Sequence, residues 1–395
     1  MTPPEIPSDV IDDIIDQLDS DFDTLKAISA SSRIMRHLAQ KRLFKTVYLN
    51  CYSRCLPNLR LLARASIHNP LLKTYVQYLK ITISPRDFHN TELITFISQL
   101  TRVRALHLLN NAMLFSDEWQ SIPLPFRTAL TQVMQSSETL RLENISDMPI
   151  SNLIHAQNLK TLILMDTTLT AHEEMTSPFD SSKVTSNSTS SIQECVVQFS
   201  LARFRPSRNS STLKVLANMD LSKLSSLKFI TNNTANVRAL EKITRNAHAL
   251  KSFKLQVLPS HHNIHLGYLS NELLRALYPI LPSLIRLELA LCGIEEELAS
   301  LELLQSLLNP FRDYNALQEF HLRLYLRDEE YDVLSLEDGL ADLRNLFRRT
   351  DLNWPSFRLA SASVMNLDAG ILSEDSHKHQ VKSQRSDISF LSLLR

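Results

Sequence analysis

The chain has 395 residues, 44% of them hydrophobic, and its 42 basic and 42 acidic side chains give a formal net charge of zero. This balance argues against a nucleic-acid binder or a membrane-surface binder, which would normally carry a basic excess. No apolar run reaches the roughly 18 residues that a membrane-spanning helix needs. No secretory leader precedes the first predicted helix, so we expect neither a membrane partner nor secretion.

The scarcity of glycine argues against several enzyme classes. The chain has four glycines, Gly267, Gly293, Gly339 and Gly370. No two of them are close enough in sequence for a dinucleotide-binding fingerprint or a P-loop. A Gly-x-Ser-x-Gly nucleophile elbow is likewise impossible. We therefore expect no catalytic residues, no cofactor and no enzyme activity, although a triad assembled from distant residues stays open.

Cysteine and histidine give no complete metal-binding pattern. The segment HHNIH at 261–265 has metal-like spacing, but no nearby glutamate or cysteine completes a zinc site. A pair of cysteines four residues apart has no second pair downstream. We therefore expect no metal. The sparse cysteines favour a reducing compartment, cytoplasmic or nuclear, over a disulfide framework; they are Cys51, Cys55, Cys195 and Cys292.

The first predicted element is a short amphipathic helix that begins near Ser8. Ser8 can serve as its N-cap, and Asp9 suits the positive end of the helix dipole. An apolar stripe follows on one side, with aspartates on the other. An isolated helix this short is marginal in water, so the stripe must be buried against its own domain core or against a partner. The stripe consists of Val10, Ile11, Ile14, Ile15 and Leu18.

Two further short helices are predicted before residue 45. The first is capped by an aspartate and contains Leu25, Ala27 and Ile28. The second starts at about Ser32 and carries apolar residues as far as Phe44. Three short helices in some forty residues make only a small core.

Residues 1–50 resemble an F-box in its fungal form. The resemblance rests on Ile6-Pro7, the apolar stripe, DTLKAIS, Ser32-Arg33 and LFKTV. Relative to the family, Ile6 replaces the usual leucine, Ser31 a small apolar residue and Phe44 a tryptophan. The resemblance implies a three-helix domain that docks on a Skp-type adaptor and through it on a cullin–RING ubiquitin ligase. It implies that the residues contacting the adaptor or shaping its groove are Ile6, Pro7, Ile14, Ile15, Leu18, Leu25 and Ile28.

The remainder of the chain repeats a strand-like pattern with apolar residues at positions 1, 4 and 6, separated by helix-like stretches. This alternation is typical of leucine-rich repeats, so we expect an irregular leucine-rich-repeat-like α/β solenoid over 51–360. A non-repetitive α/β domain is the alternative. Weaker copies are TLRLEN near Leu140 and LKVLAN at 213–218. Position 4 of the stronger copies is occupied by Leu79, Leu106, Leu162, Cys195, Leu227, Phe253, Leu287 and Phe320.

Two polar stretches interrupt the pattern. Residues 176–191 are rich in serine and threonine, which predicts a flexible loop. Residues 361–395 are predicted to form a poorly ordered tail.

The C-terminal strand-like copies also predict a substrate surface. Side chains between the buried positions must point away from the core because strand side chains alternate. A mixed, mostly basic set of this kind suits an acidic or phosphorylated peptide, and ordinary solvated surface is the alternative. The predicted substrate-binding residues are Lys254, Arg286, Glu288, Glu319, His321 and Arg323.

The sequence thus predicts an α/β protein with an N-terminal three-helix F-box followed by the repeat array. With the resemblance, it indicates a non-catalytic substrate-recognition subunit of a Skp–cullin–F-box ubiquitin ligase that binds a protein substrate. One alternative is a leucine-rich-repeat binding scaffold outside a ubiquitin ligase. Another, disfavoured by the glycine count, is a hydrolase or other enzyme on the α/β body.

Overall fold

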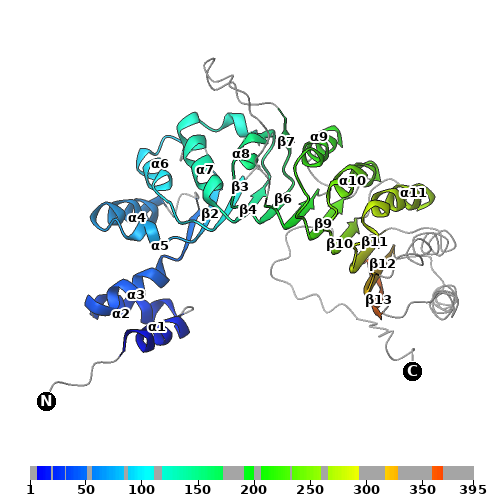
Figure 1. The fold of residues 1–395 in the computed structure, drawn as a ribbon. Helices are drawn as coiled ribbons and strands as arrows, with labels where there is room; N and C mark the ends of the chain where they lie inside the picture. Colours follow the sequence, from blue (N-terminus) through cyan, green and yellow to red (C-terminus); the bar gives the residue numbers. More distant parts are fainter. Residues whose placement is uncertain are drawn as a thin grey trace. The chain divides into compact units, whose positions relative to one another are not determined.

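A computed structural model of the chain divides into two compact units, Met1–Ser190 and Ser191–Arg395, here called the N-terminal unit and the C-terminal unit (Figure 1). The described residues are 7–18, 21–31, 33–50, 56–83, 88–110, 118–171, 191–199, 206–231, 234–258, 266–292, 316–327 and 358–367. The predicted loop at 176–191, apart from its last residue, and the tail beyond 367 lie outside them.

The N-terminal unit begins with three helices, α1 (Ser8–Gln17), α2 (Phe22–Ser31) and α3 (Arg33–Leu43), here called the three-helix domain. The N-cap of α1 is Pro7, without a side-chain cap, so the predicted cap at Ser8 is wrong. The aspartate cap of α2 is confirmed: Asp21 accepts hydrogen bonds from Thr24 N at 3.0 Å and Thr24 Oγ1 at 2.7 Å.

A small apolar core holds these helices together. Ile15 of α1, Leu25 of α2 and Ala39 of α3 are buried at its centre. Each helix contributes one central residue, so removing any of the three helices would expose the other two. Partly buried apolar side chains pack around them, namely Ile11, Leu18, Ile28, Leu38 and Leu43.

The sheet of the N-terminal unit is entirely parallel and follows directly on α3. Its strand order is β1-β2-β3-β4-β6. The predicted F-box limit at residue 50 therefore includes a strand of the sheet, because Val47 and Leu49 are buried in register with Leu79 and Ile81. The strands are β1 (Thr46–Asn50), β2 (Tyr78–Ile83), β3 (Ala105–Asn110), β4 (Thr139–Glu143) and β6 (Thr161–Met165), with a separate ladder of β5 (Met148–Pro149) and β7 (Leu169–Thr170).

The C-terminal unit repeats this parallel arrangement in the order β8 to β13. The predicted start of the tail at residue 361 falls inside β13, which pairs with β12 as far as Leu367. The strands are β8 (Glu194–Gln198), β9 (Ser226–Thr231), β10 (Ser252–Val257), β11 (Arg286–Cys292), β12 (Glu319–Arg327) and β13 (Arg358–Leu367).

Within each unit the helices between strands lie along one side of the sheet (Figure 1). The prediction of a strand at LKVLAN is wrong, because residues 213–217 belong to helix α9. The helices are α4 (Leu56–His68), α5 (Leu72–Tyr75), α6 (Thr91–Ser98), α7 (Leu124–Ser136), α8 (Ser151–Ile154), α9 (Pro206–Ala217), α10 (Thr234–Asn246) and α11 (Leu266–Leu277), with 3₁₀ turns η2 (Trp119–Ser121) and η3 (Tyr278–Ile280).

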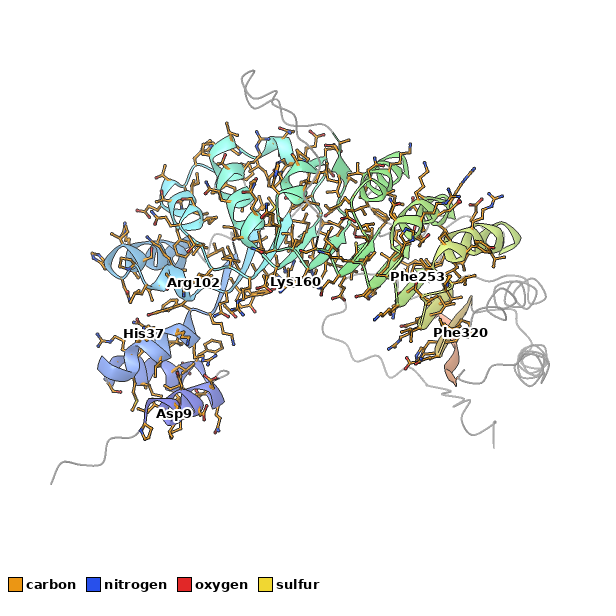
Figure 2. All side chains as sticks on the ribbon, viewed as in Figure 1. Asp9, His37, Arg102, Lys160, Phe253 and Phe320 are labelled. Carbon is orange, nitrogen blue, oxygen red and sulfur yellow. The ribbon has the colours of Figure 1, made fainter. Side chains whose placement is uncertain are left out.

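The core lies between sheet and helices and is built from the predicted apolar positions. In the copy that contains β3, the residues at positions 1, 4 and 6 are all buried, namely Val103 just before the strand and Leu106 and Leu108 within it. Phe253 of β10 and Phe320 of β12 occupy position 4 and are fully buried (Figure 2). The predicted α/β class is confirmed, with a large parallel sheet. No helix in the described ranges combines the length and apolarity that a bilayer crossing requires.

We expect the thiol of Cys195, at position 4 of β8, to be inert in the folded protein. Burial, with a smaller contribution from Glu194, raises its pKa to about 12, and only the thiolate is nucleophilic. Iodoacetamide should leave Cys195 unmodified in native buffer and modify it fully in guanidinium, as read by peptide mass spectrometry. Equal labelling in both conditions would contradict the burial of this strand.

Candidate functional site

The first candidate site is the outer surface of α1. Val10 is 43% exposed and Ile14 is 52% exposed, and Pro7 is exposed one turn before Val10. Helical spacing places all three on one side of α1. We call Pro7, Val10 and Ile14 the exposed α1 face. Phe22, at the start of α2, is a further exposed large apolar side chain.

The structure separates the seven residues implied for adaptor binding into distinct groups. Pro7 and Ile14 are exposed, and Leu18 and Ile28 are half-buried against the domain core. Ile15, at 1% exposure, and Leu25 belong to that core, so they can only shape the surface from beneath. Ile6 lies outside the described residues. The sequence assignment omitted Val10 and Phe22.

The neighbouring isoleucines of α1 should respond differently to truncation. Ile15→Ala should destabilise the three-helix domain by about 2–5 kcal/mol, because it leaves a cavity in the core. Ile14→Ala should change that stability by no more than about 0.5 kcal/mol. Native-state hydrogen exchange of the amides in α1, α2 and α3 measures both. Equal loss of protection in the two variants would show that Ile14 is also a core residue.

Polar contacts join α3 of the three-helix domain to α5 and to the turn that precedes it. Tyr75 Oη lies 2.5 Å from His37 Nδ1, and the two rings meet edge-on at 5.3 Å (Figure 2 labels His37). Burial raises the pKa of Tyr75, so its hydroxyl stays protonated in this contact. Asn69 Nδ2 donates to Gln40 Oε1 at 3.2 Å.

The second candidate site is the open face of the C-terminal sheet, where the predicted substrate residues lie. Their alignment is as expected: Lys254, Glu288 and His321 are in register on adjacent strands. Their charges, however, are paired. Lys254 Nζ lies 2.5 Å from Glu288 Oε1, and Glu288 is almost buried.

A second set of pairs on this face involves Glu319. Its Oε2 lies 3.6 Å from Arg286 Nε and 3.8 Å from His321 Nε2. The backbone of Arg323 is in register with Ala290. These pairings neutralise much of the positive charge that the sequence indicated, so this face is mixed rather than basic.

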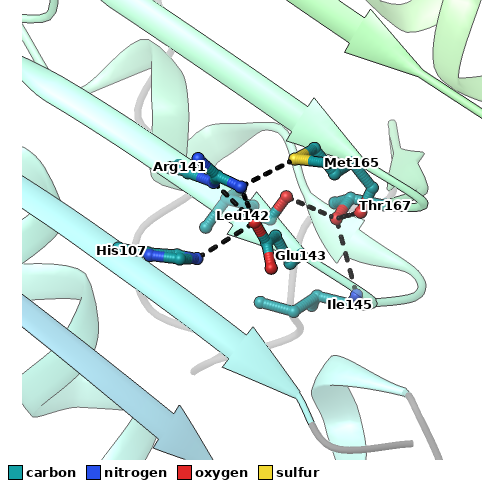
Figure 3. Close-up of polar contacts among 7 residues, drawn as sticks. All are labelled: His107, Arg141, Leu142, Glu143, Ile145, Met165 and Thr167. Atoms are coloured by element: carbon teal, nitrogen blue, oxygen red, sulfur yellow. Dashed lines mark hydrogen bonds and ion pairs between the residues drawn. The ribbon is translucent and has the colours of Figure 1, made fainter. Parts of the chain in front are cut away.

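A third cluster lies on the open face of the N-terminal sheet and was not predicted (Figure 3). Glu143 at the end of β4 accepts from Arg141 Nε at 2.5 Å, and its Oε1 lies 3.2 Å from His107 Nε2 on β3. Arg141 Nη2 also lies 3.1 Å from Met165 Sδ on β6. His107 is buried, whereas the Arg141 side chain is 40% exposed. In the sequence, this cluster could have been found from the polar residues that stand between the buried positions of neighbouring strand-like copies.

The electrostatics of this cluster favour an ionised carboxylate. Burial alone raises the pKa of Glu143, but the hydrogen bonds and electrostatic interactions with His107 and Arg141 outweigh it. The net pKa therefore lies below the usual glutamate value. The cluster can hold one negative charge on the sheet face and orient Arg141.

The lowered pKa predicts a defined loss of stability in acid. Glu143 stabilises the fold above its unfolded pKa of about 4.3, and this contribution disappears as the pH falls through the lower folded value. Urea midpoints of wild type and Glu143→Gln should therefore differ most above about pH 5 and converge towards about pH 3. A difference that stays constant across this range would refute the pairing.

In the part of the chain that the structure describes, no three His, Cys, Asp or Glu side chains are grouped so that they could hold a metal ion. The segment HHNIH at 261–265 and the cysteines at 51 and 55 lie outside the described residues.

Comparisons with known proteins do not assign this chain to a family. No protein-family model matches it, and a search of curated proteins gives no match. The functional argument therefore rests on the residues and their geometry.

Proposed function

We propose that this protein is a substrate-recognition subunit of a Skp–cullin–F-box ubiquitin ligase. The three-helix domain is the F-box and binds the Skp-type adaptor, and through it a cullin–RING ligase. The strand–helix array binds a protein substrate. In this proposal the chain performs no catalysis and acts by holding the substrate near a ubiquitin-conjugating enzyme.

The exposed α1 face carries the proposal. Ile14 is 52% exposed although its neighbour Ile15 is 1% exposed, so α1 has apolar residues beyond what its own core uses. Single exposed apolar residues are common, but three on one side of one helix are a patch that a partner helix can cover. The F-box resemblance places the adaptor contact on this helix.

The architecture of the body supports the second half of the proposal. Apolar positions 1, 4 and 6 are buried in successive parallel strands, as leucine-rich repeats require. Helices cover one side of each sheet, and side chains that alternate with the buried ones occupy the other. We infer a leucine-rich-repeat-like solenoid whose open sheet face meets the substrate.

The buried free thiol of Cys195 fits the cytoplasm or the nucleus, where cysteines stay reduced and where this ligase system would act. The proposal includes no nucleic-acid, membrane, metal or cofactor partner.

The adaptor contact is tested by Ile14→Asp. Burying an isoleucine contributes about 1.5–3 kcal/mol, and a buried unpaired carboxylate adds a further cost, so adaptor affinity should fall by more than about tenfold. Binding of purified Skp-type adaptor to the full chain, by pull-down and biolayer interferometry, measures the effect. Circular dichroism should stay unchanged because Ile14 is outside the core.

A matched control separates interface loss from a general effect of a new charge. Ile67 on α4 is 69% exposed, so Ile67→Asp makes the same change at an exposed site outside the three-helix domain. This variant should bind the adaptor like wild type. If wild type itself does not bind the adaptor, the ligase proposal fails and a repeat scaffold outside the ligase takes its place.

A further inference from the structure

A row of four side chains crosses the open face of the N-terminal sheet. Tyr48 on β1 is in register with Lys80 on β2, Lys80 with His107 on β3, and His107 with Arg141 on β4. Adjacent strands are about 4.8 Å apart, so the four side chains follow one another across the sheet. We call them the Tyr48–Arg141 row.

The row begins with an exposed aromatic side chain. Tyr48 is 67% exposed, and its ring meets that of Tyr78 edge-on at 6.1 Å. Burial raises the pKa of Tyr78, Tyr48 and Glu143 raise it further and Arg141 lowers it, so this ring lies within electrostatic reach of the cluster. Tyrosine and arginine, which stand at the two ends of the row, are enriched among the residues that contribute most of the binding energy at protein interfaces.

The charge around the row is predominantly basic. We consider the described residues of the strands β1 to β6 that face away from the core, and the residue that precedes each strand of the sheet. The carboxylates in this set are Glu138 and Glu143. Glu138 is shared by Lys160 at 2.8 Å and Arg104 at 4.0 Å. The basic residues in the same set are Lys45, Lys80, Arg104, Arg141 and Lys160, with His107 in addition.

The geometry of Arg141 distinguishes between two kinds of acidic ligand. Its Nε and Nη2 groups both face Glu143, and Nη2 also contacts Met165. A phosphate is best recognised by a guanidinium that offers both parallel donors, and here those donors already bind a carboxylate. For a ligand, Arg141 then offers a partly exposed edge and Lys80 offers a single charge. These two groups suit separate carboxylates.

We propose that the Tyr48–Arg141 row binds an extended, carboxylate-rich segment of a partner protein, with Tyr48 as its apolar anchor. The inference rests on the proposed function, in which that partner is the substrate. It places the acidic-peptide surface on the N-terminal sheet, away from the C-terminal residues that the sequence indicated. The C-terminal face is less suited because its Lys254 is already paired with Glu288.

The test is fluorescence anisotropy with the full chain and a short fluorescein-labelled peptide in which glutamate alternates with serine. We expect binding that weakens as salt is raised, and no binding of the same peptide with glutamine in place of glutamate. Lys80→Glu should weaken binding by about fivefold or more, since it replaces an attraction by a repulsion. Tyr48→Ala should weaken it by about fivefold.

Lys214→Glu is the matched control. Lys214 is exposed on α9, so the same charge reversal there should leave peptide affinity unchanged. Glu143→Gln should tighten binding because it releases Arg141. Equal affinity in wild type and Lys80→Glu would overturn the proposal, as would preference for a phosphoserine version of the peptide.

Adaptor binding is measured in parallel to keep the two proposals apart. Ile14→Asp should lose the adaptor and keep the peptide, whereas Lys80→Glu should lose the peptide and keep the adaptor. Failure of wild type to bind the glutamate peptide, with adaptor binding intact, would overturn this inference alone.

Discussion

Register between parallel strands is the constraint on which this molecule depends. Each strand is two-faced, and helices cover one side, so the apolar residues must occupy the same positions in every strand. A slip of one residue would move Leu106 and Leu108 from the core to solvent and bring His107 inside. The apolar spacing repeats along the sequence because the apolar residues of every strand must face the same side of the sheet.

The same register arranges the polar residues. Side chains at equivalent positions of neighbouring strands lie directly beside one another, so like charges in successive strands would repel. The chain places a carboxylate among the bases instead: Glu143 beside His107 and Arg141, and Glu288 beside Lys254. The charge of the open face is therefore set by ion pairs both within and across strands.

Sequence patterns predicted those parts of the fold that depend on spacing. The strands of the stronger copies, the helices α6, α7, α10 and α11 and the aspartate cap of α2 follow from local chemistry. The segment LKVLAN was wrongly predicted as a strand because its apolar residues, Leu213, Leu216 and Ala217, fit a helix as well as a strand. The packing of the surrounding chain decides between the two structures. The predicted boundaries at 50 and 360 fall at the end of β1 and within β13, two strands whose place depends on pairing with a neighbour.

The candidate sites were less predictable than the fold. Periodicity puts Ile14 and Ile15 on the same apolar side of α1, and only the position of α2 and α3 determines which one is buried. The His107–Glu143–Arg141 cluster joins residues from two strands, so it becomes visible only when the register is known. Val10 was part of the recognised stripe, but its exposure depends on tertiary packing.

The joint between α3 and β1 has a consequence for how a ligand would be presented. Helix α3 ends at Leu43 and β1 begins at Thr46, and the Tyr75–His37 contact fastens the same junction. A connection this short restricts the movement of the three-helix domain relative to the sheet. In the proposed function, a substrate on the N-terminal sheet would be held at a restricted angle to an adaptor on α1, so that only some of the substrate's lysines would face the ubiquitin-conjugating enzyme. Lengthening this joint would broaden the range of reachable lysines and lower the effective concentration at each of them.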